Sequence, residues 1–217
     1  LIARRSRVKM DQVLVTTGAT EANFLANVAL VRPRDRVVVD SPLYSPLRDC
    51  ASGIGAQVVP VPRDCGDGWA LDLDRFRKAA AGKAKLLVFA NLNNPTSAAI
   101  GRSELKELAD LAEECDGYVL IDETFRDLAF RDAPPSVATL GPRMVALSTV
   151  TKVAGLGALR VGWILADPDL LERFKNVKDY TTVCGSSVSQ VLALWALERW
   201  DFFRRRAKDI LDQNHRV

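Results

Sequence analysis

Seven short apolar runs, separated by stretches with helical periodicity, constrain the fold of this chain more than any other feature. Each run is nearly continuous in hydrophobic residues instead of alternating, which is typical of strands buried on both faces. The runs cover residues 13–16, 36–40, 56–61, 85–90, 118–122, 144–148 and 160–166. Their strand–helix–strand order predicts an α/β fold of three layers, in which helices cover both faces of a mostly parallel, about seven-stranded sheet.

The stretches between the runs supply the expected helices, at residues 21–31, 45–52, 73–81, 103–115 and 168–178. The fourth has an apolar stripe through Leu105 and Leu108, and Gly117 ends it. The segment 186–217 has the pattern of one helix of roughly 30 residues, well beyond the usual length in globular proteins. We expect this long C-terminal helix to lead toward a small domain that lies outside the chain.

Length and charge narrow the classes of function. A chain of 217 residues with 48% hydrophobic content fits one α/β domain. Its 30 basic and 27 acidic residues are spread along the sequence, so we expect neither nucleic acid nor a membrane surface as a partner. The basic clusters at residues 4–7 and 204–206 are interpreted as solvated helix faces. No apolar run approaches the roughly 20 residues that span a bilayer.

Cysteine and histidine usage excludes other classes of site. The four cysteines form no Cys-x-x-Cys pair, and His215 is the single histidine. No metal site and no histidine-based catalytic triad are therefore predicted. Unpaired thiols favour a reducing compartment, and we expect a cytoplasmic protein.

Polar residues follow the strands at their carboxyl ends, the edge at which parallel α/β sheets bind ligands. After the first run, Gly18 permits a sharp turn, and the free N–H groups of Ala19 and Thr20 open a helix that favours an anion such as phosphate. An ordinary helix cap is the alternative. Tyr44 follows the second run in a proline-framed loop, where it either stacks on a planar ligand or packs on the surface.

Two further strand ends carry an amide and a carboxylate. Asn94 can donate to a ligand oxygen, although an Asx-type turn would also explain it. Asp122 follows four apolar positions, so its carboxylate should require a cationic partner. A helix cap or a structural ion pair is the alternative for Asp122.

The sixth run is followed by Thr149, Thr151 and Lys152. A partly desolvated lysine at this place can form an imine and then move a proton, whereas an ordinary surface lysine would only keep its ammonium in water. Arg160 begins the seventh run and can clamp a phosphate with two hydrogen bonds. The nearby stretch GLGALR lacks a third glycine and precedes a strand, which excludes a dinucleotide-binding turn. These groups together predict a site for a phosphorylated, aldehyde-bearing, basic aromatic ring.

Five ordered motifs in residues 16–163 resemble the large domain of class I/II aminotransferases, which are pyridoxal-phosphate enzymes of fold type I. The motifs read TGATEAN, SPLYSPL, NLNNPTS, DETF and STVTKVAGLGALRVGW. The resemblance implies pyridoxal 5′-phosphate as the cofactor, with Lys152 as the catalytic Schiff-base lysine and Asp122 as the catalytic partner of the pyridine nitrogen. It implies Asn94 at the ring hydroxyl and Tyr44 against the ring. The implied phosphate site consists of Ala19, Thr20, Thr149, Thr151 and Arg160.

Three positions depart from the family pattern. Phe125 replaces a tyrosine that donates to the ring oxygen, Ser97 replaces a common glycine, and Leu92 replaces a frequent proline. The family's N-terminal segment and small domain are also not recognised in the chain. We therefore expect residues 1–217 to be the cofactor-binding large domain of a longer enzyme, with reduced activity by itself.

The expected function is an aminotransferase that exchanges an amino group between an amino acid and a keto acid, as a homodimer by resemblance. Two alternatives remain open. One is another pyridoxal-phosphate reaction, that of a lyase, cyclase or oxidase in natural-product biosynthesis, toward which Phe125 points. The other is a non-catalytic aminotransferase-like module, which intact Lys152, Asp122 and Arg160 would also fit.

Overall fold

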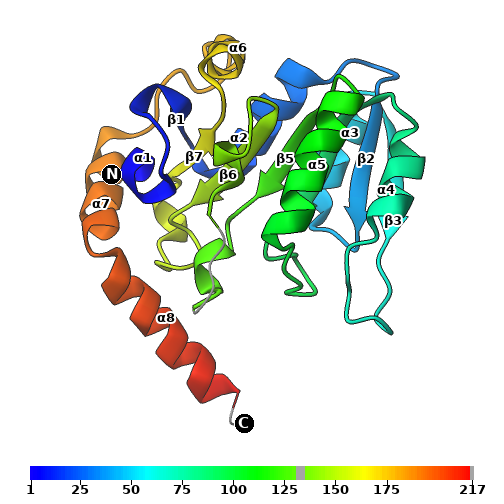
Figure 1. Cartoon of the computed structure of the whole chain (residues 1–217). Helices are drawn as coiled ribbons and strands as arrows, with labels where there is room; N and C mark the ends of the chain where they lie inside the picture. Colours follow the sequence, from blue (N-terminus) through cyan, green and yellow to red (C-terminus); the bar gives the residue numbers. More distant parts are fainter. Residues whose placement is uncertain (131–134, 216–217) are drawn as a thin grey trace.

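The structure, a computed structural model, describes residues 1–130 and 135–215. Its centre is one seven-stranded sheet with the strand order β1-β7-β6-β5-β4-β2-β3 (Figure 1). The strands are β1 (Val13–Thr16), β2 (Arg36–Ser41), β3 (Gln57–Pro62), β4 (Ala84–Ala90), β5 (Tyr118–Asp122), β6 (Met144–Thr149) and β7 (Gly162–Leu165). Strands β2 to β6 pair in parallel, and β7 runs antiparallel to β1 and β6. The predicted mostly parallel sheet is confirmed.

The helices alternate with the strands as the sequence predicts. They are α1 (Ile2–Ser6), α2 (Gly18–Leu30), α3 (Ser45–Gly53), α4 (Leu73–Ala80), α5 (Arg102–Glu114), α6 (Pro168–Lys178), α7 (Ser187–Glu198) and α8 (Trp200–Asn214). Short 3-10 turns are η1 (Met10–Gln12), η2 (Arg126–Leu128), η3 (Val137–Thr139) and η4 (Gly157–Leu159). Helix α2 begins at Gly18, earlier than the predicted start at residue 21, because the turn after β1 passes directly into the helix. None of the helices in the described residues is long and apolar enough to cross a membrane.

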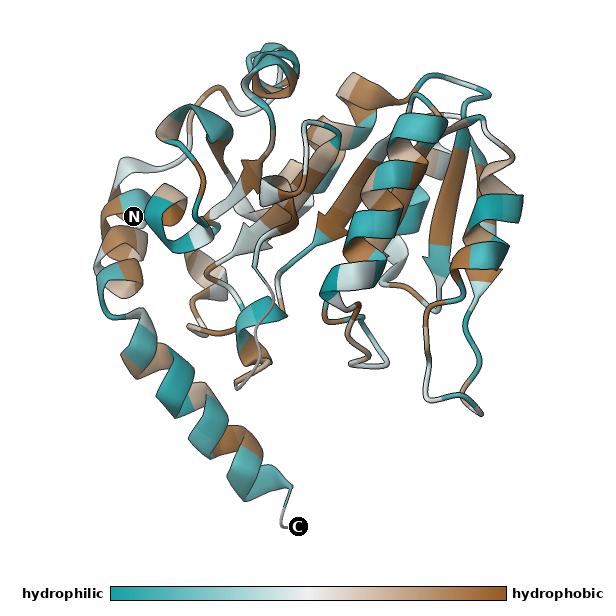
Figure 2. Ribbon diagram, in the orientation of Figure 1, coloured by the Kyte–Doolittle hydropathy of each residue, from teal (hydrophilic) through white to brown (hydrophobic). Residues whose placement is uncertain are grey.

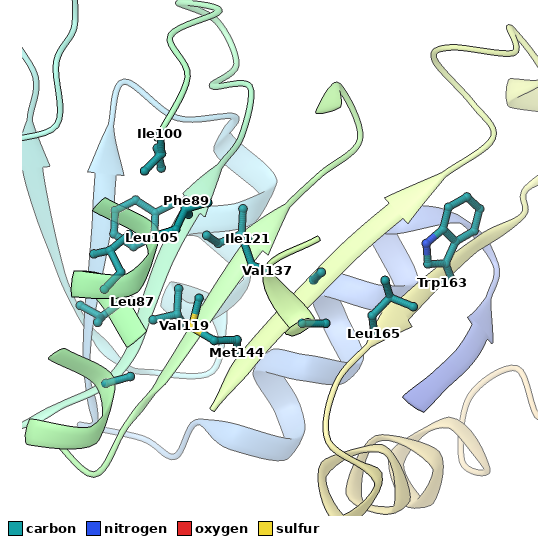
Figure 3. Packing of buried hydrophobic residues seen from close by; sticks show 14 of the residues in the cluster. Leu87, Phe89, Ile100, Leu105, Val119, Ile121, Val137, Met144, Trp163 and Leu165 are labelled. Carbon is teal, nitrogen blue, oxygen red and sulfur yellow. The ribbon is translucent and has the colours of Figure 1, made fainter. Parts of the chain in front are cut away.

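Two apolar clusters, one on each face of the sheet, make the fold a three-layer sandwich. Alternate residues of the central strands point to opposite faces: Val37 and Val39 pack in one cluster and Val38 in the other. Helices α2, α3 and α6 cover the first face, and α4 and α5 cover the second. Figure 3 shows the second cluster, in which Phe89 and Ile121 of the strands meet Leu105 of α5. Each fully buried side chain of this size contributes about 1.5–3 kcal/mol.

The outer faces of α4 and α5 are hydrophilic, whereas the strands are hydrophobic along most of their length (Figure 2). The burial pattern agrees, because β4 and β6 are buried on nearly every residue. This pattern explains why the strands read as continuous apolar runs. The predicted α/β/α class is therefore confirmed.

The segment 186–217, predicted as one helix, forms two helices that meet at Arg199. Arg199 leaves helical geometry, with φ −110° and ψ 25°. The physical reason is that the two helices dock on different parts of the core: α7 packs against η4, and α8 packs against η2. Beyond this anchor α8 extends away from the sheet, as Figure 1 shows. The long C-terminal helix is thus α8, shorter than predicted, and residues 216–217 of the predicted helix lie outside the described residues.

Helix α8 is anchored by its first residues. The Trp200 indole N–H donates to Asp127 Oδ2. Arg204 donates to the backbone carbonyls of Asp127, Ala129 and Phe130, at 3.0, 3.2 and 2.6 Å. The interpretation of residues 204–206 as a solvated face is therefore wrong for Arg204, whereas Arg205 and Arg206 are exposed.

Candidate active site

A cavity of about 200 Å³ opens at the carboxyl edge of the parallel strands. It lies where β5 and β6 end and where α2 begins. All the site residues predicted from the sequence line this one cavity: Ala19, Thr20, Tyr44, Asn94, Asp122, Thr149, Thr151, Lys152 and Arg160. The principle that ligands bind beyond the carboxyl ends of parallel strands thus brings residues 141 positions apart in the chain, from Ala19 to Arg160, into one place.

One end of the cavity is built from backbone. Gly18 has a φ of +81°, and a Cβ there would lie 2.4 Å from Arg160 Nη2. Glycine therefore permits both the turn and the close approach of the guanidinium. The first-turn N–H groups of Ala19 and Thr20 have no intrahelical acceptor, and the helix dipole places partial positive charge there.

Arg160 supplies the full positive charge at this end. Its Nη1 donates to Gly157 O at 3.2 Å, and its Nη2 lies 3.5 Å from Thr17 O. Among the described residues no carboxylate forms an ion pair with Arg160. The nearby Glu21 instead accepts from the backbone N–H of Thr17 and from the hydroxyl of Thr182. The guanidinium is therefore available to an anion.

Thr149 and Thr151 also line the cavity. Thr149 Oγ1 donates to Val161 O at 2.7 Å and accepts from Thr151 N at 3.2 Å. The two hydroxyl oxygens lie 2.9 Å apart. Because the Thr149 proton is committed to Val161, the Thr151 hydroxyl donates between the pair and is the one that can turn toward a ligand.

Asp122 is the last residue of β5 and lines the cavity. The Thr124 N–H donates to its Oδ1 at 2.9 Å. Burial raises the pKa of Asp122, while the hydrogen bonding by Thr124 and the positive charge of Lys152 oppose the rise. A cationic ligand that docked here would replace the water that the carboxylate has lost.

Lys152 lies three residues after the end of β6, is exposed and lines the cavity. Its Nζ lies 5.9 Å from the centroid of the Phe125 ring. The part of the chain that the structure describes places no carboxylate within ion-pair distance of this ammonium. An amine held next to an aromatic wall and free of a salt bridge can react with a carbonyl ligand.

Tyr44 and Asn94 complete the rim of the cavity. Tyr44 is 47% exposed and stands at the residue before α3. Asn94 is half-buried in the loop after β4, and its side-chain amide has no hydrogen bond to any described residue. An aromatic plate and a free amide thus face a cavity that carries a cation and N–H donors at one end and a carboxylate within it.

Comparison with known proteins identifies the family. A family model, aminotransferase class I and II, matches residues 2–217. The chain belongs to this family. Pyridoxal 5′-phosphate is the cofactor of these aminotransferases.

Individual aminotransferase relatives agree. The chain is 35% identical to capreomycidine synthase of Streptomyces vinaceus over 203 residues. The aligned region covers 92% of the chain and 52% of the synthase. The chain is 30% identical to aspartate aminotransferase of Streptomyces avermitilis, covering 94% and 53%. A crystal structure of a PLP-dependent aminotransferase from Streptococcus suis matches with a TM-score of 0.88 and 31% identity, covering 94% and 54%. The chain spans about half the length of the curated relatives that it matches.

The aminotransferase cofactor fits the donor set of this cavity. Pyridoxal 5′-phosphate carries a phosphate, a basic ring nitrogen and an aldehyde. These correspond to the cationic end at Arg160, the carboxylate of Asp122 and the amine of Lys152. A methyl group on Gly18 would fill the space between this residue and Arg160. The space therefore exists because Gly18 has no side chain.

The cavity also contains residues that the sequence reasoning missed. Asn23, Pro46, Leu47 and Thr124 line the cavity. Asn23 Nδ2 donates to Pro46 O at 2.9 Å and thereby ties α2 to the start of α3. The spacing could have revealed Asn23, because a residue four positions after Ala19 lies on the same face of the helix.

Two departures from the aminotransferase pattern have structural consequences. Phe125 lines the cavity and offers no hydroxyl. Ser97 has a φ of +63°, the left-handed region that glycine adopts freely, at a cost of about 1–2 kcal/mol for another residue. The Ser97 N–H donates to Asn93 O at 2.9 Å, which helps to hold this turn.

Proposed function

We propose that residues 1–217 form the cofactor-binding large domain of a pyridoxal-phosphate-dependent aminotransferase that acts on an amino acid and a keto acid. One observation carries the proposal: Lys152, Asp122 and Arg160 line the same cavity, next to the amino terminus of α2. Family membership supports it.

The cofactor would supply an aldehyde that reacts with amines and a ring that accepts electrons from the substrate. The residues of the chain would do the remaining work. Lys152 Nζ would attach the cofactor and, when released, move a proton to or from the substrate α-carbon. Asp122 would hold a proton on the ring nitrogen.

The other proposed roles concern binding and orientation. Arg160, with the N–H groups of Ala19 and Thr20, would hold the phosphate, and the hydroxyls of Thr149 and Thr151 lie beside it. Asn94 would donate to the ring oxygen, and Tyr44 would cover one face of the ring. A ring fixed at both ends has less freedom to leave the reactive geometry.

A second candidate function is another pyridoxal-phosphate reaction on an amino acid, such as a cyclisation. Two observations favour it: Phe125 offers no hydroxyl to the ring, and one relative is a capreomycidine synthase. Both candidates use the same cofactor site, so they differ in the fate of the substrate. Product analysis after one turnover of the parent protein separates them, because transamination moves the amino group of the substrate to the cofactor, whereas a cyclisation keeps that nitrogen in the product.

We further propose a homodimer in the cytoplasm. Helix α7 supports an interface, because it exposes the apolar residues Val188, Val191, Leu192, Leu194 and Trp195. The four cysteines are free, which agrees with a reducing compartment.

The experiment that tests the proposed site compares absorption spectra after pyridoxal phosphate is added. We expect a visible band in the wild type and in Lys175→Ala, a control that removes an exposed lysine of α6, and no band in Lys152→Ala. Borohydride reduction and peptide mapping should then place the adduct on Lys152. Equal labelling of many surface lysines would sink the proposal.

A further inference from the structure

A buried ion pair lies at the carboxyl ends of β2 and β3, outside the cavity. Arg63 Nε donates to Asp40 Oδ1 at 2.8 Å, and Arg63 Nη2 donates to Asp40 Oδ2 at 2.7 Å. The two side chains are 1% and 0% exposed. Neither residue lines the cavity.

Asn93 extends this pair into a network. Its side chain is buried, and Nδ2 donates to Asp40 Oδ2 and to Pro42 O, both at 3.1 Å. Its Oδ1 accepts from the backbone N–H and the hydroxyl of Thr96, at 3.1 and 2.8 Å. The side-chain amide of Asn93 therefore uses both its N–H groups and its oxygen, and it joins the loop after β2 to the loop after β4.

The two loops that Asn93 joins are those that carry the ring-binding residues. Pro42, whose carbonyl it holds, stands two residues before Tyr44, and Asn94 is the next residue in the chain. Arg63 adds a second tie to the first loop, because its backbone N–H donates to Ser41 O at 2.7 Å. Arg63 Nη1 also donates to Trp69 O at 2.9 Å.

Energetics indicates that this network does more than stabilise the fold. A buried ion pair loses hydration on both partners, and well-packed apolar residues are often equally stable or more stable in its place. What a satisfied polar network supplies is one defined geometry. Its directional bonds end here on the backbone of residues 41–42 and 96, beside the two ring contacts.

We propose that Asp40, Arg63 and Asn93 are positioning residues that fix Tyr44 and Asn94 at the ring end of the cofactor cavity without touching the ligand. The inference rests on the proposed function, because it assumes that the ring lies between these two contacts. The phosphate end is held by other elements, α2 and the residues around β7, with no bond from this network. Loosening the network should therefore weaken binding of the ring and spare binding of the phosphate.

The test uses two probes on the full chain. Pyridoxine 5′-phosphate has the ring and the phosphate but no aldehyde, so it binds without reacting with Lys152, and inorganic phosphate reports the phosphate end alone. Isothermal titration gives both dissociation constants, and urea unfolding gives the stability. For Asn93→Ala, which removes the links to Pro42 and Thr96, we expect the dissociation constant of pyridoxine 5′-phosphate to rise roughly tenfold. That of phosphate should change less than about twofold.

A matched control comes from the same loop. Asn91 is also buried, and its amide exchanges two hydrogen bonds with Ile100, each 3.1 Å long, with no bond to Asp40 or Pro42. Asn91→Ala should lower the stability and leave the ratio of the two dissociation constants unchanged. An equal change of that ratio in both variants would reduce Asn93 to a structural role and overturn the proposal.

Arg63→Lys serves as the milder variant, because it keeps the charge and loses the two-pronged contact. The Arg63→Lys chain should fold, and its dissociation constant for pyridoxine 5′-phosphate should rise less than that of Asn93→Ala. A wild type that binds phosphate but not pyridoxine 5′-phosphate would overturn the proposed function itself. A wild type that binds both, with both variants unchanged, would overturn only the positioning role.

Discussion

The two ends of the cavity are built in different ways. The end that we propose for the phosphate consists largely of backbone: the first turn of α2, which begins at Gly18, and a guanidinium that lies against that turn. The end that we propose for the ring consists of side chains on separate loops, supported by other side chains. The difference teaches that a fold can fix an anion site through its main chain, whereas orientation of a ring depends on particular buried residues.

The largest effect on stability and phosphate binding is expected at Gly162, where the main chain of β7 lies against the main chain at the start of α2. A Cβ at Gly162 would lie 2.6 Å from Gly18 C and 2.8 Å from Ala19 N, and neither atom can move without moving α2. Gly162→Ala should therefore cost about 3 kcal/mol in the free energy of unfolding and abolish phosphate binding. Gly157→Ala is the control, because its methyl would only touch Thr151 Cγ2 at 3.4 Å. Urea unfolding and phosphate titration measure both, and a fully stable Gly162→Ala would contradict the backbone description.

An intermediate effect, on phosphate binding, is expected when the guanidinium of Arg160 is removed. Arg160→Ala removes charged hydrogen bonds worth about 1.5–3 kcal/mol, so the dissociation constant of phosphate should rise roughly tenfold to a hundredfold. Stability should change little, because within the described residues Arg160 forms hydrogen bonds only to backbone carbonyls, at 3.2 and 3.5 Å. Arg77→Ala removes the same charge outside the cavity, where Arg77 pairs with Glu114. Equal weakening in the two variants would mean that net charge alone attracts the anion.

The smallest effect is expected in the pH dependence of stability. Burial raises the pKa of Asp122, so its contribution is complete below the ordinary carboxyl pKa and is lost as the pH rises through the folded-state value. Asp122→Asn removes this loss, and the ligand-free variant should gain stability over the wild type with rising pH. It should also bind pyridoxal phosphate more weakly.

Asp116 gives the opposite sign and serves as the control for Asp122. Hydrogen bonding to Arg143 lowers the pKa of Asp116, so its contribution is present above the ordinary carboxyl pKa and is lost as the pH falls. Asp116→Asn should therefore lose stability relative to the wild type as the pH rises. Urea unfolding across the acidic to neutral range measures the stability of both variants relative to the wild type. If the two differences change with pH in the same direction, the burial of Asp122 is refuted.

The sequence was sufficient to predict the strands and most of the cavity lining, because most of the predicted residues follow an apolar run at a known edge of the sheet. Asn23, Pro46, Leu47 and Thr124 were missed. The sequence also did not reveal Asp40, Arg63 or Asn93. Asp40 ends the second predicted run, and Arg63 and Asn93 look like ordinary loop residues after the runs that follow. Only the pairing of β2 with both β3 and β4 brings the three together. The break at Arg199 was also hidden, since no glycine or proline marks it and tertiary docking decides it.

The anchor of α8 has a mechanical consequence. Arg204 donates to the carbonyl of Asp127 within η2 and to those of Ala129 and Phe130 just after it, and Trp200 donates to the Asp127 side chain. The same turn begins directly after Phe125, whose ring stands beside Lys152. Helix α8 and the aromatic wall of the cavity are therefore both connected to η2, and a movement of one can be transmitted to the other through this turn. A tilt of α8 would be felt at the aromatic wall only a few residues away.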